Sequence, residues 1–210
     1  MIVITVPKRY LILGALAITA SLTVSVIYLT STSQSDNPET IRASDSCNSL
    51  STDRAIAALN AVLPDRSDYS FDEEPPGSYS TEASGSFSTS CFVRSEQDLL
   101  LSARARMMTA EPPKVWENEL LQGDAGGASK VTHFEAGVRG VVSLDKAAAF
   151  VPCVPEGKIP GGSYNLSVVV DLKKRGDASE ATARKSLIDL TVSAAAYAHK
   201  VSKCTLPSRI

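Results

Sequence analysis

The sequence lacks an excess of basic residues. It contains 21 Lys and Arg against 23 Asp and Glu, which gives a formal net charge of −2. The one basic run, Lys173-Lys174-Arg175, follows an apolar stretch and precedes Gly176, a pattern that is typical of a solvated turn. Proteins that bind nucleic acid usually carry a basic stripe or patch. The charge pattern therefore argues against that class, and we expect no nucleic-acid partner.

The short motifs of common catalytic sites are also missing. Gly85-Ser86-Phe87-Ser88 is not the Gly-x-Ser-x-Gly elbow of serine hydrolases. Residues 122–129 are rich in glycine but lack the Lys-Ser or Lys-Thr ending of a phosphate-binding loop. The acidic run at 72–74 lacks the spacing of a calcium loop. The only histidines, His133 and His199, fit structural positions in a strand and near a helix end. The sequence thus favours a protein that is not an enzyme, without deciding the point, and we expect no cofactor.

Closely spaced cysteines, which would indicate a metal site, are absent as well. The four cysteines are Cys47, Cys91, Cys153 and Cys204. An even number in an oxidising compartment predicts two disulfides, and three pairings are possible. We favour Cys47–Cys91 and Cys153–Cys204, since each joins a segment with a predicted helix to a nearby predicted strand. In the chain-entropy model, a disulfide that closes a loop of this length stabilises the fold by about 4 kcal/mol.

One long apolar run lies near the N-terminus. Residues 11–30 carry no charged side chain, and a helix of that length spans the hydrocarbon core of a bilayer, about 30 Å. Lys8 and Arg9 precede the run, whereas Asp36 and Glu39 follow it. The positive-inside rule therefore places the N-terminus in the cytoplasm and the remainder of the chain outside.

We therefore expect a single-pass protein of the cell membrane. Its parts are a cytoplasmic N-terminus at residues 1–9, a transmembrane signal-anchor at 10–30 in contact with the lipid bilayer, a polar stalk at 31–46 and an extracytoplasmic domain at 47–210.

A cleaved signal peptide is the alternative for the same segment. The apolar core of a signal peptide is usually about 7 to 15 residues and is followed by a small-x-small site. Here the Ala-x-Ala sequence at 15–17 lies inside the apolar run, and a weaker site lies at 31–33. Cleavage within the run would leave an apolar stretch on a secreted protein, so we favour retention, and the sequence leaves cleavage open.

Beyond the stalk, the pattern predicts an α+β domain. Helices are expected at 51–63 and 177–203, each with an apolar face, and a short helix at 115–121. Strands are expected at 86–94, 97–108, 131–134, 138–144, 147–154 and 163–172. Residues 65–85, including the acidic run at 72–74, are expected to form a mostly exposed loop, in which the sequence leaves open a short strand near 69–71. We predict an antiparallel sheet covered by a short N-terminal helix and a long C-terminal helix.

Two strand segments have informative side chains. In 97–108, Leu, Ala and Met residues alternate with a second face that carries Arg104 and Arg106, which we expect to be exposed or paired with acids. In 147–154, the prolines around Cys153 suggest an edge strand or a strand end, because proline has no N–H for a ladder hydrogen bond.

Trp116 is the only tryptophan. If the segment PPKVWENELL at 112–121 is exposed, Trp116 is a candidate contact for a partner, as aromatic hot spots are. The alternative is that Trp116 packs on the sheet.

Three short sequences give the chain a family likeness. They are Cys47-Asn48-Ser49-Leu50 before a helix, the strand pair VRGVVSL and FVPC, and the closing helix that ends AYAHKVSKC. The chain resembles uncharacterised membrane-anchored extracytoplasmic proteins of actinobacteria, including cysteine-containing lipoprotein-type domains of unknown function. The resemblance covers residues 47–204, and the chain differs from the lipoproteins in having no cysteine beside the apolar run. It implies an α+β domain at the cell envelope and assigns no functional residue.

Together these observations favour a membrane-tethered extracytoplasmic domain. We expect a non-enzymatic binding or accessory module whose partner is a protein or polymer of the envelope. The alternative is an envelope hydrolase with a site built from scattered Ser, His and carboxylate residues. An enzyme should show a pocket in which a histidine meets a serine or a carboxylate, whereas a binding module should show an open groove or apolar patch.

Overall fold

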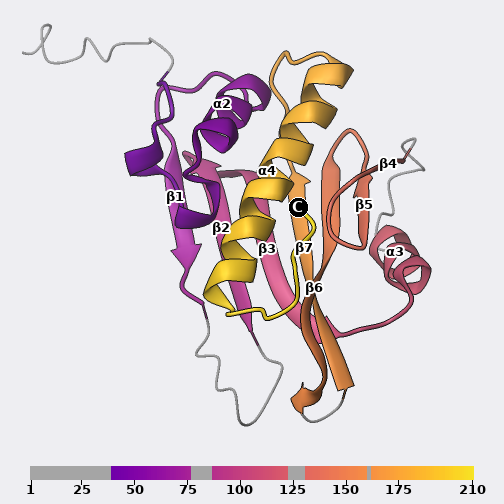
Figure 1. Ribbon diagram of the computed structural model, residues 1–210. Helices are drawn as coiled ribbons and strands as arrows, with labels where there is room; N and C mark the ends of the chain where they lie inside the picture. Colours follow the sequence, from indigo (N-terminus) through magenta and orange to yellow (C-terminus); the bar gives the residue numbers. More distant parts are fainter. Residues whose placement is uncertain (1–38, 77–86, 123–130, 160–161) are drawn as a thin grey trace, which may run out of the picture. The chain divides into compact units, whose positions relative to one another are not determined.

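The computed structural model describes residues 39–76, 87–122, 131–159 and 162–210 (Figure 1). The predicted cytoplasmic N-terminus at 1–9, the signal-anchor at 10–30 and residues 31–38 of the predicted stalk lie outside this part. Among the helices that are described, none is both long enough and apolar enough to span a membrane.

One antiparallel sheet of seven strands organises the described residues, in the order β1-β2-β3-β7-β6-β5-β4. The strands are β1 Ser70–Glu74, β2 Ser88–Ser95, β3 Asp98–Thr109, β4 Thr132–Phe134, β5 Arg139–Val142, β6 Lys146–Ile159 and β7 Gly162–Leu172. The α-helices in this part of the chain are α2 Asp53–Val62, α3 Pro113–Gln122 and α4 Glu180–Val201. The predicted α+β class and the long C-terminal helix are confirmed.

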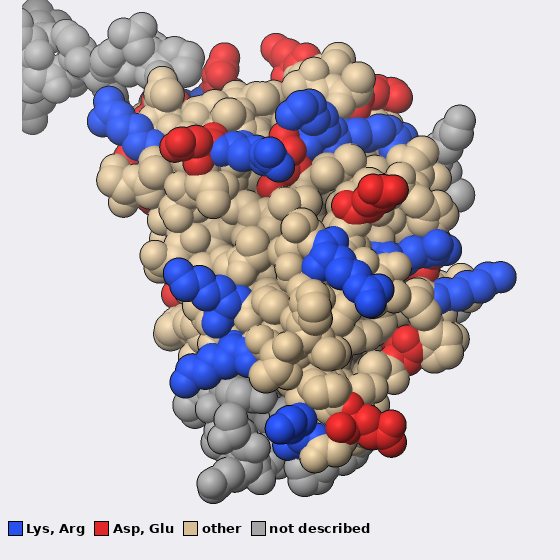
Figure 2. Space-filling model, in the orientation of Figure 1, with Lys and Arg blue, Asp and Glu red and all other residues tan. Residues whose placement is uncertain are grey.

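Helices α2 and α4 cover the first face of the sheet (Figure 1). Each begins at a hydroxyl cap: Thr52 Oγ1 accepts the N–H of Ala55, and Ser179 Oγ accepts the N–H of Thr182, both at 3.2 Å. Such caps stabilise a helix by about 1 kcal/mol. The side of α4 toward the sheet is built from leucines and small residues, which let the helix pack closely. On the outer side, basic and acidic side chains are interspersed (Figure 2).

Helix α3 packs on part of the second face, which the sequence analysis had left uncovered. Along β6, successive side chains alternate between the two layers. Ala147 and Ala149 belong to the large core under α4, whereas Ala148 and Phe150 belong to a smaller cluster with Trp116 of α3. The sheet is therefore covered on its first face by two helices, and over β5, β6 and β7 on its second face by one.

One strand prediction is wrong, and a second holds for only part of its strand. Residues 72–74, expected in an exposed loop, belong to β1, where Asp72 lies opposite Phe92 and forms an ion pair with Arg94 at 3.2 Å. The first part of β6 lies between β5 and β7, but Pro152 and Pro155 lie beyond Phe150, the last residue that pairs with β5, so the predicted edge applies to this second part of the strand. It accommodates its prolines because the pairing with β7 shifts register between Pro152 and Val154.

Residues 39–46, predicted to belong to the stalk, are part of the packed domain. The side chain of Ile41 is buried, with 4% exposed. Its backbone N–H donates to Asn60 Oδ1 and its carbonyl accepts from Asn60 Nδ2, both at 3.0 Å. The Glu39 carboxylate accepts the N–H of Tyr69 at 2.9 Å. These contacts join the segment to α2 and to the start of β1, so the folded domain begins before Cys47.

Both disulfides have the pairing that the sequence analysis favours. Cys47–Cys91 joins the segment before α2 to β2 across a Cα–Cα distance of 6.1 Å. Cys153–Cys204 joins β6 to the residues after α4 across 4.3 Å. The chain after Cys204 continues along β6, where the N–H of Thr205 donates to the carbonyl of Cys153 at 2.8 Å. Two such bonds are consistent with a domain in an oxidising, extracellular compartment.

Removing one disulfide should lower stability strongly. We expect the double substitution Cys153→Ser and Cys204→Ser to lower the free energy of unfolding by about 4 kcal/mol, because the loop that the bond closes no longer restricts the unfolded chain. Urea unfolding under non-reducing conditions measures this change, with Thr205→Ser as the control. An unfolding midpoint equal to that of the wild type would contradict it.

Candidate ligand-binding cleft

A cleft of about 500 Å³ lies on the second face of the sheet, where α3 leaves the strands uncovered. Strands β2, β3 and β7 form its floor, α3 forms one wall, and Lys146 at the start of β6 lies at one end. Its volume is within the range of small-molecule sites, roughly 300 to 1,000 Å³. It is therefore the candidate binding site of the described domain.

The floor of the cleft is polar because of the side-chain alternation on β2 and β3. Ser90 lies directly opposite Arg104, and Ser88 lies opposite Arg106. Toward the centre of the sheet, Arg104 lies opposite Val169 of β7. The apolar residues that alternate with the two arginines along β3 point to α4. Because successive side chains of a strand point to opposite faces, the arginines point to the second face.

The positive charges of the two arginines are not neutralised by a directly contacting carboxylate among the described residues. The guanidinium of Arg104 lies 5.9 Å from the centre of the Phe92 ring, which is a cation–π distance. Neither Arg104 nor Arg106 forms an ion pair or hydrogen bond with any residue that the structure describes. Both side chains are exposed. Of the two outcomes considered in the sequence analysis, exposure rather than pairing with acids is found.

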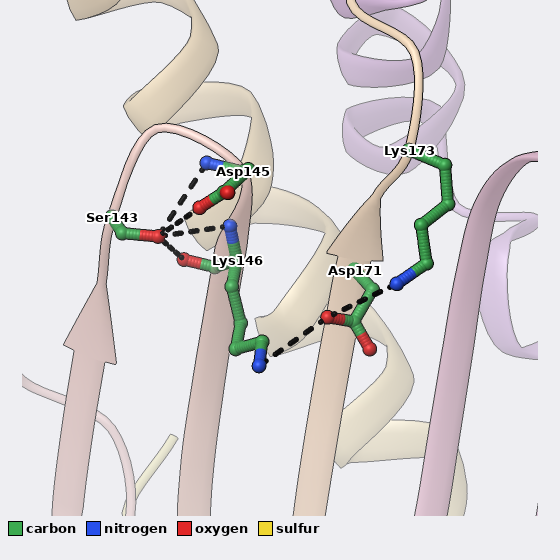
Figure 3. Close-up of polar contacts among 5 residues, drawn as sticks. All are labelled: Ser143, Asp145, Lys146, Asp171 and Lys173. Carbon is green, nitrogen blue, oxygen red and sulfur yellow. Dashed lines mark hydrogen bonds and ion pairs between the residues drawn. The ribbon is translucent and has the colours of Figure 1, made fainter. Parts of the chain in front are cut away.

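One end of the cleft holds a compact charge network (Figure 3). The carboxylate of Asp171 lies between two ammonium groups, 3.6 Å from Lys146 Nζ and 3.7 Å from Lys173 Nζ. Lys146 and Asp171 face each other on neighbouring strands. The negative charge of Asp171 is thus balanced locally, and this end of the cleft is not acidic.

The neighbouring Ser143 is committed to a turn. Its hydroxyl donates to Asp145 Oδ1 at 2.6 Å and accepts the N–H of Lys146 at 3.1 Å. Figure 3 shows the Lys146 side chain extending away from this hydroxyl toward Asp171. Ser143 therefore closes the connection between β5 and β6, and its contacts are those of a structural residue.

Trp116 forms part of the α3 wall and is buried, with 3% of its surface exposed. Its ring stacks on Phe150 with 5.1 Å between centroids and 15° between planes, and its indole N–H donates to Ser167 Oγ at 2.9 Å. Exposure was the condition for the predicted partner contact at Trp116. That condition is not met, because the indole packs on the sheet.

Glu117, the next residue, holds α3 to strands β4 and β5 at one edge of the sheet. Its carboxylate accepts a hydrogen bond from Arg139 Nε at 2.8 Å and lies 2.9 Å from His133 Nε2. Burial raises the pKa of Glu117, but the hydrogen bonds from Arg139 and His133 outweigh burial, and the net pKa lies below the ordinary value of 4.5. The carboxylate is thus ionised near neutral pH and holds α3 to β4 and β5.

The two histidines have local structural contacts. His133 lies beside Glu117, and neither residue lines the cleft. His199 Nε2 lies 2.8 Å from the carbonyl oxygen of Leu206, which joins the end of α4 to the C-terminal segment. These contacts agree with the structural roles expected for both residues.

Two glutamates, Glu111 and Glu119, add negative charge near Arg106 and the cleft wall. Burial raises the pKa of Glu111, repulsion from Glu119 raises it further, and the charge of Arg106 lowers it. Glu119 lines the cleft from α3. The site thus combines a basic floor with one acidic group on its wall.

Comparisons of the chain with protein-family models, with curated proteins and with solved structures gave no match. The resemblance to actinobacterial extracytoplasmic proteins therefore stays a prediction.

Sequence reasoning recognised the arginine face but not the cleft. The alternation in 97–108 places Arg104 and Arg106 together, and the structure places the serines of β2 opposite them. The alternation of residues along the strands does not reveal the position of α3, which forms one wall of the cleft. The signal that could have indicated the cleft was a short predicted helix that follows a strand with a charged face.

The contact between α3 and the sheet should depend on pH through Glu117. A carboxyl whose pKa is lower in the folded than in the unfolded state stabilises the fold above the unfolded pKa, and this contribution is lost as pH falls through the folded pKa. We expect Glu117→Gln to cost about 2 kcal/mol at neutral pH, and the difference from wild type to shrink below pH 4.5. Urea unfolding across this range measures it, with Glu135→Gln, an exposed neighbour, as control. A pH-independent difference would contradict the assignment.

The indole of Trp116 should owe part of its stabilising effect to Ser167. Trp116→Phe keeps an aromatic ring against Phe150 but leaves a buried hydroxyl without its donor, which costs about 1 kcal/mol. In a Ser167→Ala background the same substitution should cost less, because no unsatisfied hydroxyl remains. A double-mutant cycle from unfolding curves measures the coupling. Equal costs in the two backgrounds would show that the hydrogen bond contributes nothing.

Proposed function

We propose that this chain is a membrane-tethered extracytoplasmic binding module that holds an envelope component in the cleft on the second face of its sheet. The observation that carries the proposal is the pair Arg104 and Arg106. Two exposed guanidinium groups line a cleft of ligand size and form no ion pair with a carboxylate among the described residues. Charged groups that the fold does not pair are available to pair with a ligand.

The predicted topology supports the location. The charge asymmetry around residues 10–30 favours an anchor with the folded domain outside the cytoplasm. The two disulfides are bonds that persist in an oxidising compartment. A domain tethered in this way samples the envelope close to the membrane, where polymers and membrane proteins are its available partners.

The alternative, an envelope hydrolase, has weaker support. A serine nucleophile needs a base within hydrogen-bond reach. The serines of the cleft, Ser88, Ser90 and Ser167, make no hydrogen bond to a histidine in the part of the chain that the structure describes. His133 does meet the carboxylate of Glu117, but outside the cleft and as part of the contact that holds α3. The geometry therefore favours binding over hydrolysis.

A photoreactive amino acid at position 88 tests the proposal on membranes of the native host. Ser88 is exposed and lines the cleft, whereas Ala57 is exposed on α2 at the opposite face of the sheet. We expect a discrete adduct from position 88 that mass spectrometry identifies as an envelope component, with residues 1–30 still present in the protein.

The same substitution at position 57 is the matched control and should give no such adduct. The double variant Arg104→Gln and Arg106→Gln should remove the adduct at position 88. Equal adducts at both positions, or an adduct insensitive to the arginines, would show that the cleft is not the binding face.

A further inference from the structure

The two arginines of the cleft are spaced for a ligand with more than one acidic group. Arg104 and Arg106 are two residues apart on β3 and point to the same side, so their Cα atoms lie about 7 Å apart. Guanidinium groups bind carboxylates and phosphates through paired hydrogen bonds, and more specifically than lysines do. The hydroxyls of Ser90 and Ser88 stand opposite the two arginines and can donate to the same acidic groups.

The opposite wall selects against a ligand that is only an anion. Glu119 lines the cleft from α3 and would repel a second phosphate or carboxylate placed beside it. A carboxylate does, however, accept hydrogen bonds from hydroxyl groups. The cleft therefore fits a molecule with acidic groups toward β3 and hydroxyl groups toward α3.

Apolar surface completes the site. Leu120 of α3 and Val169 of β7 line the cleft together with Trp116. Binding sites commonly combine such apolar lining with a few convergent polar groups. The C–H face of a sugar ring presents this kind of surface between its hydroxyls. Acidic groups, hydroxyls and an apolar face occur together in acidic carbohydrates.

We propose that the cleft binds an anionic saccharide, a segment of envelope glycan that carries carboxylate or phosphate groups. The inference rests on the proposed function and adds the chemical class of its ligand. Arg104 and Arg106 hold the acidic groups, Glu119 accepts hydrogen bonds from hydroxyls, and Leu120 and Val169 contact the ring.

The only tryptophan provides a direct readout, because Trp116 borders the cleft. The full chain, purified in a detergent without a sugar headgroup, is titrated with trigalacturonic acid and separately with glucose 1-phosphate. Tryptophan fluorescence and calorimetry are recorded in parallel. We expect saturable binding of at least one of these probes, weakened by added salt. A galactose trisaccharide and inorganic phosphate, each carrying half of the proposed chemistry, should bind at least tenfold more weakly.

Two matched double variants locate the binding. Arg104→Gln with Arg106→Gln should weaken binding of the acidic probe about tenfold or more, as the loss of charge-assisted hydrogen bonds predicts. Arg42→Gln with Arg175→Gln removes the same charge from exposed positions outside the cleft and should leave the affinity unchanged. Unaltered unfolding curves verify that both variants fold.

Each contrary result overturns a different part of the inference. Equal binding of the galactose trisaccharide would remove the role of charge, and equal binding of inorganic phosphate would remove the saccharide. Full affinity in the Arg104 and Arg106 variant would place the ligand elsewhere. If neither acidic probe binds, the ligand class is wrong, whereas an adduct at position 88 that depends on the arginines would still support a binding cleft.

Discussion

Much of this structure depends on the alternation of side chains along the central strands. In β6, alternate residues belong to two different apolar clusters, one under α4 and one under α3, so this strand requires cover on both faces. In β3 the same alternation gives an apolar first face and a charged second face. A helix can bury the second face over β6, but burial of the unpaired guanidiniums of Arg104 and Arg106 would cost several kcal/mol for each charge. Helix α3 therefore covers only the apolar part, and the boundary between the two parts is the cleft.

Two neighbouring residues give the wall of that cleft its position. Trp116 fixes one side of α3 by stacking on Phe150 and by its hydrogen bond to Ser167, and Glu117 fixes the other side through Arg139 and His133. The helix has ten residues, too few to be stable alone in water. Its packing on the sheet therefore supplies its stability. Glu119, which lines the cleft, is not one of the residues that hold α3 on the sheet.

The success of sequence reasoning varied with the strength of the local signal. The long helix α4 and the strand with Arg104 and Arg106 follow from the periodicity of apolar residues, which is a local signal. The acidic residues 72–74 precede two prolines, a pattern typical of a solvated loop, but as an edge strand β1 needs to bury little and pairs Asp72 with Arg94. The prolines of β6 predicted an edge or a strand end, and they lie beyond the residues that pair with β5, next to a register shift against β7. Ile41 joins the core through Asn60, a contact between distant segments that composition does not reveal.

What the sequence by itself determined is the class of fold, the faces of its main elements, and four cysteines whose favoured pairing the structure has. These depend on residue spacing and on which segments a disulfide can join, and both can be inferred from the linear sequence. Only the tertiary structure decided the position of β7 between the two groups of strands, the placement of α3 on the second face and the burial of Trp116. Each of these depends on which apolar surface finds a partner, and such a choice is made between segments that are far apart in the chain. The cleft belongs to this second group, since its floor and its wall come from different parts of the sequence.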